Sequence, residues 1–283
     1  MSQPSPDSTL STFTASDGEN IAVQDWPWPL SGRPRGMVLI VHGLGEHAGR
    51  YDIFAKRLNQ WGFAVRSYDQ YGHGESDGVR GGLPTTNRLL DDLTDLVESS
   101  YRRAGPGVPL LLFGHSMGGL VAASFVSRGR QPVDALVLSS PLLAMRLNPV
   151  QKMMMKVVPR VAPNLTVSNG VEPEFLTHDH GVVAEYRIDP RVHDRVSSRL
   201  ARFFADEGPA VVARAPQWCV PTLLLYAGAD KVVDPSGSRA FAAAAPPAMV
   251  AAHCFEGHYH EIFNEVDREP VYRELQDLSL IHI

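Results

Sequence analysis

The sequence predicts an α/β fold, in which a mostly parallel central sheet is flanked by helices and interrupted by one helical insertion. Continuous apolar runs, which are typical of strands buried on both faces, recur along the chain. Segments with helical periodicity alternate with these runs, as parallel strands joined by crossover helices require. Between residues 141 and 217 the apolar runs stop and prolines punctuate short helical pieces, which indicates an insertion between two strands.

The elements follow in chain order. Residues 1–10 are rich in Ser and Pro and are expected to be disordered, whereas 11–14 and 21–26 alternate around Asp17-Gly18 as a β-hairpin. Strands are predicted at 37–41, 63–68, 110–113, 135–140, 222–226 and 250–255, of which 37–41 and 110–113 are expected to be buried. Helices are predicted at 50–60, 89–101, 120–126, 235–245 and 270–278. The core therefore comprises residues 11–140 and 218–277, and the insertion comprises 141–217.

The last six residues, 278–283, break the polar and apolar texture of the last predicted helix. Their sequence, Leu-Ser-Leu-Ile-His-Ile, matches the translation of a transposase sequencing adapter, CTG TCT CTT ATA CAC ATC. We therefore expect this tail to be non-native and to be poorly packed or disordered.

Composition excludes several classes of protein. The net charge is −5 and no block of like charge occurs, so we expect no nucleic-acid partner. No Cys-x-x-Cys pair or His-rich tract indicates a metal site, and no run of ~18 apolar residues predicts a membrane span. The polar residues 1–12 do not resemble a signal peptide, so a cytoplasmic location is expected. Cys219 and Cys254 lie in apolar surroundings and are expected to pack in the core without forming a disulfide.

The segment Gly114-His115-Ser116-Met117-Gly118 matches the pattern G-x-S-x-G between a predicted strand and a predicted helix. A serine on so sharp a turn needs small neighbours, and Gly114 and Gly118 have no Cβ. Such a turn lifts the serine hydroxyl above the edge of the sheet. Ser116 is therefore predicted to be a nucleophile.

A serine nucleophile needs a base and an acid that orients the base, in the chain order Ser, Asp or Glu, His. Asp230 and Asp234 both follow the strand at 222–226. Asp234 precedes Pro235 and a helix, as an N-cap does, so Asp230 is predicted to be the catalytic acid. His258 and His260 share the next loop, and periodicity does not separate them as the base.

The oxyanion of an acyl-transfer reaction needs two backbone donors. The N–H of Met117, directly after the nucleophile, is one candidate, and the N–H of Leu44, after the strand at 37–41, is the other. The glycines on either side of Leu44 also suggest a dinucleotide-binding loop. Their spacing differs from G-x-G-x-x-G, and no Tyr-x-x-x-Lys pair occurs, so no cofactor is expected.

Together these residues resemble the monoacylglycerol lipase and lysophospholipase-like family of the α/β-hydrolases. The resemblance covers about residues 13–274. Its motifs are His42-Gly43-Leu44-Gly45-Glu46-His47 with Gly49-Arg50-Tyr51, Gly72-His73-Gly74-Glu75-Ser76-Asp77-Gly78, the Ser116 segment, Gly228-Ala229-Asp230 and Glu256-Gly257-His258-Tyr259-His260-Glu261.

The resemblance implies the α/β-hydrolase fold and a catalytic triad of Ser116, Asp230 and His260. It also implies that Glu46, Arg50 and Tyr186 contact a glycerol-like head group. Phe263 stands where some members of the family carry a second histidine, and it counts as a further candidate contact.

The insertion would then be a helical cap over the site. Its apolar residues, with methionines that suit a flexible acyl chain, are Leu147, Val150, Met153, Met154, Val157 and Val158. Packing of this face on the core is an equally open alternative, and weak, reversible contact with a membrane surface through the cap is a further expectation.

The expected function is cleavage of carboxylic esters of single-chain lipids, with a monoacylglycerol as the substrate and an acyl-enzyme as the intermediate. The alternatives are a lysophospholipase, a small-ester carboxylesterase, an amidase similar to proline iminopeptidase and a non-catalytic binding protein with a hydrolase fold. A dehalogenase would need an aspartate in place of Ser116. The oligomeric state stays open.

Overall fold

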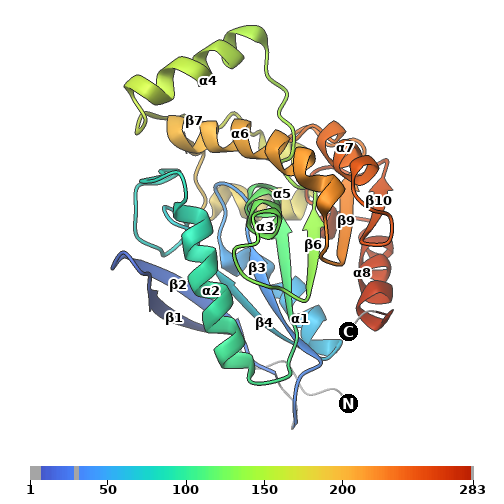
Figure 1. Ribbon diagram of the computed structural model, residues 1–283. Helices are drawn as coiled ribbons and strands as arrows, with labels where there is room; N and C mark the ends of the chain where they lie inside the picture. Colours follow the sequence, from blue (N-terminus) through green and yellow to red (C-terminus); the bar gives the residue numbers. More distant parts are fainter. Residues whose placement is uncertain (1–7, 29–31, 282–283) are drawn as a thin grey trace.

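The computed structural model describes residues 8–28 and 32–281, and its centre is a sheet of eight strands (Figure 1). The strand order is β1-β2-β4-β3-β5-β6-β9-β10. Strand β2 runs antiparallel to both β1 and β4, and the strands from β4 to β10 pair in parallel. The predicted mostly parallel α/β sheet is thereby confirmed.

The strands of this sheet agree with the predicted apolar runs to within a few residues. They are β1 (Thr9–Thr14), β2 (Asn20–Trp26), β3 (Gly36–Val41), β4 (Phe63–Tyr68), β5 (Leu110–His115), β6 (Ala135–Ser139), β9 (Thr222–Ala227) and β10 (Val250–Phe255). The hairpin of β1 and β2 begins at Thr9, so the expected disorder of residues 1–10 does not hold for its last two residues. Residues 1–7 lie outside the described part of the chain.

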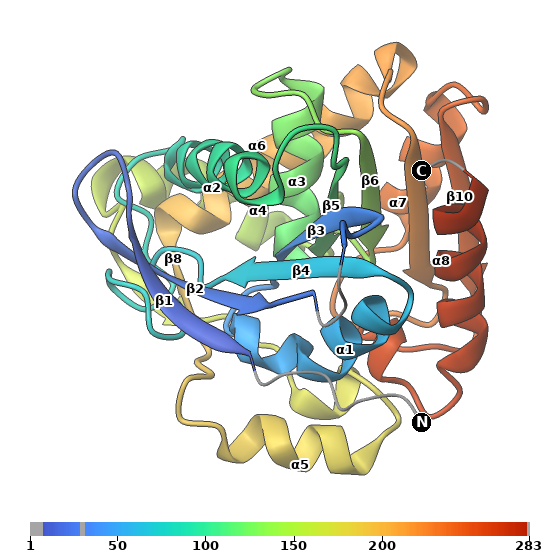
Figure 2. The same ribbon diagram turned by 90° about the horizontal axis from the view of Figure 1, so that it is seen from below.

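Helices cover both faces of the sheet (Figure 2). One face packs against α2 (Arg88–Ala104), α3 (Met117–Ser127), α6 (Ser198–Arg214) and α7 (Ser236–Ala244). The opposite face packs against α1 (Asp52–Gln60) and α8 (Glu269–Ile281). The parallel strands inside the sheet, β3 to β6 and β9, are therefore buried on both sides, which explains their continuous apolar sequence. The edge strand β10 is largely exposed.

The insertion between β6 and β9 is mainly helical and also contains two short strands that the sequence did not predict. It contains α4 (Pro149–Val161), α5 (His180–Ile188) and α6, together with a two-stranded antiparallel sheet of β7 (Thr166–Ser168) and β8 (Arg195–Ser197). Three-residue strands carry too little periodicity to be read from sequence. A capping box of Asn148 and Gln151 starts α4, which lies farthest from the sheet in Figure 1.

Two expectations about single segments also need correction. Cys219 is exposed and Cys254 is half-buried; both are free thiols, so the expected core packing is wrong for Cys219. Helix α8 continues to Ile281, so the backbone of residues 278–281 is helical rather than disordered. His282 and Ile283 lie outside the described residues.

Candidate active site

Ser116 occupies a strained turn between β5 and α3. Its backbone has φ 54° and ψ −119°, a left-handed conformation that a residue with a side chain rarely adopts. A Cβ on Gly118 would lie 2.0 Å from the carbonyl oxygen of Val41, and one on Gly114 would lie 2.5 Å from that of Gly118. The two glycines of the predicted motif are thus required by the close approach of neighbouring backbone.

The hydroxyl of Ser116, the imidazole of His260 and the carboxylate of Asp230 form a continuous hydrogen-bonded chain. Ser116 Oγ donates to His260 Nε2 at 2.8 Å, and His260 Nδ1 donates to Asp230 Oδ2 at 2.7 Å. All three side chains are buried. The structure therefore brings together the three predicted residues in the order that a nucleophile, a base and an orienting acid require.

Electrostatics favour a charged pair of Asp230 and His260. Burial by itself would lower the pKa of His260, but the charge of Asp230 and its hydrogen bond raise that pKa above the usual 6.5. Burial would raise the pKa of Asp230. Interaction with His260 and the N–H groups of Val232 and Val233 lowers it overall. Asp230 is thus held as a carboxylate that stabilises an imidazolium.

The other candidate acid, Asp234, and the other candidate base, His258, make hydrogen bonds outside the triad. Asp234 is half-buried, and its Oδ1 accepts a hydrogen bond from the N–H of Ser236 at the start of α7. Nε2 of His258 bonds the carbonyl oxygen of Asp267, whereas the bonds to Ser116 and Asp230 are made by His260. Another histidine, His253 of β10, pairs with Glu274 on the surface. The geometry therefore separates His258 from His260, which periodicity did not.

The predicted oxyanion donors flank Ser116. Neither the N–H of Leu44 nor that of Met117 has a hydrogen-bond partner within the described ranges 8–28 and 32–281. Both residues are at the site, since Leu44 lines the cavity next to Ser116 and Met117 begins α3. On the far side of Leu44, the carbonyl oxygen of Gly45 accepts a hydrogen bond from the N–H of His193 in the insertion.

Glu46 and Arg50 line the same cavity, but their hydrogen bonds are largely made within the protein. Glu46 Oε1 accepts from the N–H of Gly43 and from the hydroxyl of Tyr51, and Oε2 accepts from Arg50 at 2.6 Å. Arg50 also makes a bidentate pair with Glu261 at 2.8 and 2.9 Å. Burial opposes the charge of Glu46, but Arg50 and other neighbours lower its pKa to about 2.

The other two candidate contacts differ from one another. Tyr186 of α5 lines the cavity, stacks on Arg50 with 4.8 Å between the guanidinium carbon and the ring centroid, and makes no hydroxyl hydrogen bond within the described residues. Phe263 instead packs among Phe54, Phe113 and Tyr272 in the core beneath α1 and α8 and does not line this cavity. Phe263 lines a smaller cavity of about 30 Å³ that also includes Glu46, Arg50 and Glu261, and its contact with a substrate stays a prediction.

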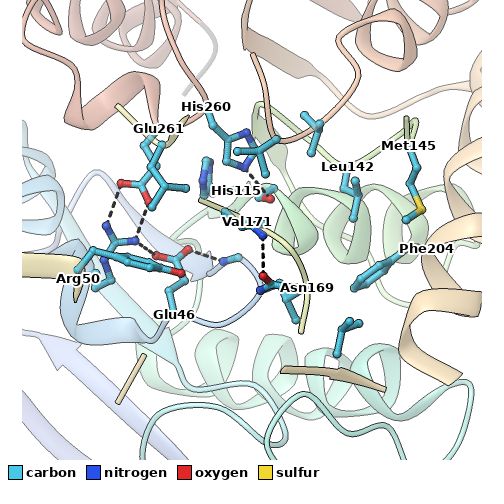
Figure 3. Close-up of a pocket in the computed structure, with 18 of the residues that line it drawn as sticks. Glu46, Arg50, His115, Leu142, Met145, Asn169, Val171, Phe204, His260 and Glu261 are labelled. Carbon is cyan, nitrogen blue, oxygen red and sulfur yellow. Dashed lines mark hydrogen bonds and ion pairs between the residues drawn. The ribbon is translucent and has the colours of Figure 1, made fainter. Parts of the chain in front are cut away.

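Ser116 and His260 line a cavity of about 150 Å³. Figure 3 shows this cavity, with His260, Met145 and Phe204 among the residues around it. Apart from the Glu46 and Arg50 side, its wall is mostly apolar, and the insertion supplies much of it. Sequence reasoning did not assign a role in the site to several lining residues. His115 and Glu261 lie within the recognised motifs, whereas no motif gave a signal for Leu142, Met145, Asn169, Val171, Leu176, Val196, Ala201, Phe204 and Val232. A long apolar group bound here would lie against the insertion with its reacting carbon at Ser116.

The structure describes residues 8–28 and 32–281. No group of three or more His, Cys, Asp or Glu side chains in this part of the chain is placed to hold a metal ion. None of its helices combines the length and the apolar character needed to cross a bilayer.

The chain is similar in sequence and in fold to known proteins. The model of the family described as serine aminopeptidase, S33, matches residues 32–267. A monoacylglycerol lipase of Mycolicibacterium smegmatis is 31% identical, over 90% of this chain and 92% of that protein. An uncharacterized abhydrolase domain-containing protein of Dictyostelium discoideum is 33% identical over 93% of this chain, which spans only 28% of that longer protein.

Among solved structures, the monoacylglycerol lipase of Paleococcus ferrophilus superimposes with a TM-score of 0.82 and 30% identity. The match covers 98% of this chain and all of that one. The fold, the extent of the family match and the identity to these relatives lead to one conclusion. The chain belongs to the serine aminopeptidase S33 family of α/β-hydrolases, within which it is similar to the monoacylglycerol lipases.

Proposed function

We propose that this protein is a serine hydrolase that cleaves the carboxylic ester bond of monoacylglycerols and similar single-chain lipid esters. The observation that carries this proposal is the chain of hydrogen bonds from Ser116 through His260 to Asp230 beneath a largely apolar cavity. The similarity to two monoacylglycerol lipases supports the choice of substrate class.

In the first half-reaction, Oγ of Ser116 attacks the ester carbonyl carbon while Nε2 of His260 takes the hydroxyl proton. Asp230 stabilises the imidazolium that forms, and the N–H groups of Leu44 and Met117 donate to the oxyanion. The tetrahedral intermediate collapses with cleavage of the bond to the alcohol oxygen. That oxygen leaves with the proton held by His260, and the acyl group stays on Ser116.

In the second half-reaction, His260 takes a proton from a water molecule, and the water oxygen attacks the acyl carbon. The second tetrahedral intermediate uses the same oxyanion donors. Its collapse breaks the bond to Ser116 Oγ, which recovers its proton from His260 as the fatty acid leaves. Asp230 keeps the same tautomer of His260 in position throughout both half-reactions.

The acyl chain is assigned to the apolar wall formed by the insertion, and the head group to the opposite, polar end of the cavity. At that end, Tyr186 presents a hydroxyl that has no hydrogen-bond partner among the described residues, and burial raises the pKa of this hydroxyl to about 12. A neutral phenol is both donor and acceptor, which suits a glycerol hydroxyl.

The aminopeptidase alternative, to which the family description gives weight, is less well supported. An enzyme of that kind must bind the ammonium group of its substrate with a free acid or carbonyl. Among the residues that line the cavity, the carboxylates are Glu46 and Glu261, and each is already paired with Arg50, so neither is a free acid that could bind an ammonium group.

We further propose that the protein acts in the cytoplasm and makes transient contact with lipid surfaces. Helix α4 exposes Val150, Met153, Met154, Val157 and Val161, each at least half accessible to solvent, and this face supports weak, reversible contact with a lipid surface. The free thiols of Cys219 and Cys254 support the cytoplasm as the compartment, because oxidising compartments favour disulfides. Vesicle co-sedimentation and cell fractionation test these two points.

The decisive experiment measures release of fatty acid from monoacylglycerols, together with a panel of p-nitrophenyl esters and aminoacyl amides. Turnover of the esters and loss of at least ~10⁴-fold in Ser116→Ala are expected, with an unchanged melting temperature within a few degrees. Near-normal hydrolysis by folded Ser116→Ala would refute the serine mechanism. Faster cleavage of the amides than of any ester would favour the aminopeptidase.

A further inference from the structure

Two segments of the candidate site come from opposite ends of the chain and must be held at a fixed separation. The first is the oxyanion loop, residues 43–46, which carries the N–H of Leu44. The second is the histidine loop, residues 256–261, which carries His260. Neither belongs to a strand or helix, so side chains must fix their relative position.

One guanidinium joins these two loops (Figure 3). Arg50 Nη1 donates to Oε2 of Glu46 in the oxyanion loop at 2.6 Å and to Oε1 of Glu261 at 2.8 Å. Its Nη2 donates to Oε2 of Glu261 at 2.9 Å. Glu261 directly follows His260 in the chain. The exposed fractions of the three side chains are 11% for Arg50, 5% for Glu46 and 6% for Glu261, so water does not compete well for these bonds.

The carboxylate of Glu46 connects Arg50 to the backbone of the oxyanion loop. Its Oε1 accepts the N–H of Gly43 at 2.5 Å, while Oε2 is the oxygen bound by Arg50. The carbonyl oxygen of Gly45 is held by the N–H of His193 at 2.9 Å. Leu44 therefore lies between Gly43 and Gly45, whose backbone groups are both held by hydrogen bonds. A shift of the Glu46 side chain would change the direction of the Leu44 N–H.

Resting on the serine-hydrolase function proposed above, we propose that Arg50 is a positioning residue that sets the oxyanion loop against the histidine loop, and not a ligand of the substrate head group. Its planar fork meets the carboxylate of Glu261 through two parallel bonds, a geometry that a lysine does not reproduce. Tyr186 covers the face of the guanidinium from the side of the insertion.

Substrates with and without a glycerol head separate the two roles. A positioning residue acts on every ester alike, so Arg50→Met should lower kcat for a monoacylglycerol and for the p-nitrophenyl ester of the same acyl length by a similar factor of about 10²-fold. KM should change by no more than a few-fold for either substrate. Arg50→Lys, which keeps the charge without the fork, should restore only part of kcat.

Arg57→Met is the matched control, because Arg57 lies on the adjacent helix α1 and also pairs with a distant glutamate, Glu269, but on the surface. It should leave kcat near wild type. A rise in KM of Arg50→Met for the monoacylglycerol alone, with normal turnover of the p-nitrophenyl ester, would overturn the proposal and make Arg50 a head-group ligand. Failure of the proposed function is distinguishable, because wild type would then hydrolyse neither ester.

The pH profile gives an independent readout. The charged or titratable groups around the His260 imidazole are Asp230, His115, Glu46, Arg50, Glu261 and Arg146, whose guanidinium bonds the carbonyl oxygen of Asp230. Arg50→Met leaves two buried carboxylates without their cation, which stabilises the imidazolium and moves the acidic limb of kcat/KM to higher pH. The isosteric Glu261→Gln removes a negative charge and moves that limb to lower pH.

Opposite shifts in these two variants support the proposal, since a general loss of folding would not produce them. Shifts of the same sign, or no shift in either variant, would overturn it. Glu261→Gln keeps the shape and an acceptor oxygen at this site, so it provides a folded variant if Arg50→Met does not fold.

Discussion

Oδ2 of Asp230 lies 2.7 Å from Nδ1 of His260, whereas Asp234, four residues later, turns its carboxylate to the N–H of Ser236. The two acids are thus divided between the triad and the start of α7. The N-cap position itself falls on Pro235 and not on Asp234, one residue later than the sequence predicts. The contact that stabilises the helix end is nevertheless made by Asp234.

Asp230→Asn should therefore lower kcat by about 10⁴-fold, because the amide no longer stabilises the imidazolium or selects the correct tautomer of His260. Asp234→Ala should keep most of kcat and lose about 1 kcal/mol of unfolding free energy. Ester hydrolysis and urea denaturation of both variants measure this. Severe loss of turnover in folded Asp234→Ala, with activity kept in Asp230→Asn, would reverse the two assignments.

The two histidines of the loop 256–261, His258 and His260, should differ in their effect on activity. His260→Ala should lose activity to the same extent as Ser116→Ala, because no other base lies within hydrogen-bond distance of Ser116 Oγ among the described residues. His258→Ala should keep much of its activity, since the His258 ring bonds the carbonyl oxygen of Asp267 and not a residue of the triad. If His258→Ala were as inactive as His260→Ala while still folded, the base would be misassigned.

The electrostatics of His260 predict where activity falls with pH. The charge of Asp230 raises the pKa of His260 above 6.5 against the effect of burial, and the imidazole must be neutral to accept the proton of Ser116. As pH falls through this raised pKa, kcat/KM should decrease, so the midpoint should lie above pH 6.5. In Asp230→Asn the carboxylate charge that raises the pKa of His260 is lost, while the burial that lowers this pKa stays. The midpoint of the residual activity should therefore move to lower pH. An unchanged midpoint would contradict this account.

The sheet, Ser116 and Asp230 were accessible from sequence because their signals are local, whereas the choice of His260 over His258 came from the family resemblance. A buried parallel strand is apolar along its whole length, and the turn at Ser116 needs glycines at fixed spacing. The pairing of Arg50 with Glu261 was not accessible, since 211 residues separate them and neither side chain has a periodic or spacing signature. The position of Phe263 was not accessible for the same reason, because its ring packs against aromatic residues from three other segments of the chain.

The cavity lining was inaccessible for a related reason. Asn169 and Val171 belong to an irregular stretch after β7, and their approach to Ser116 depends on how the insertion docks on the core. That docking uses backbone contacts, such as Gly45 with His193 and Gly81 with Ser197, which any sequence with the right turns can make. Backbone contacts leave little trace in residue type.

The last prediction concerns the length of the acyl chain. Each CH₂ group that moves from water into the apolar cavity should stabilise the complex by ~0.8 kcal/mol, so kcat/KM should rise from acetate toward medium-chain esters and level off when the cavity is full. Monoacylglycerols should be cleaved well, with little advantage over alkyl esters of equal chain length. Triacylglycerols should be poor substrates, because the insertion leaves no room for two further chains.

Met145 should set the point at which this rise ends. Together with Phe204 it lines both the cavity above Ser116 and a second cavity, of about 420 Å³, that also includes Met155 of α4. Met145→Ala should open a path between the two and extend the rise to longer acyl chains, whereas Val150→Ala, on the exposed face of α4, should leave the profile unchanged. Steady-state kinetics on p-nitrophenyl esters of increasing length measure both variants. A wild-type preference for acetate, or a profile of Met145→Ala identical to that of wild type, would show that the acyl chain does not lie along this wall.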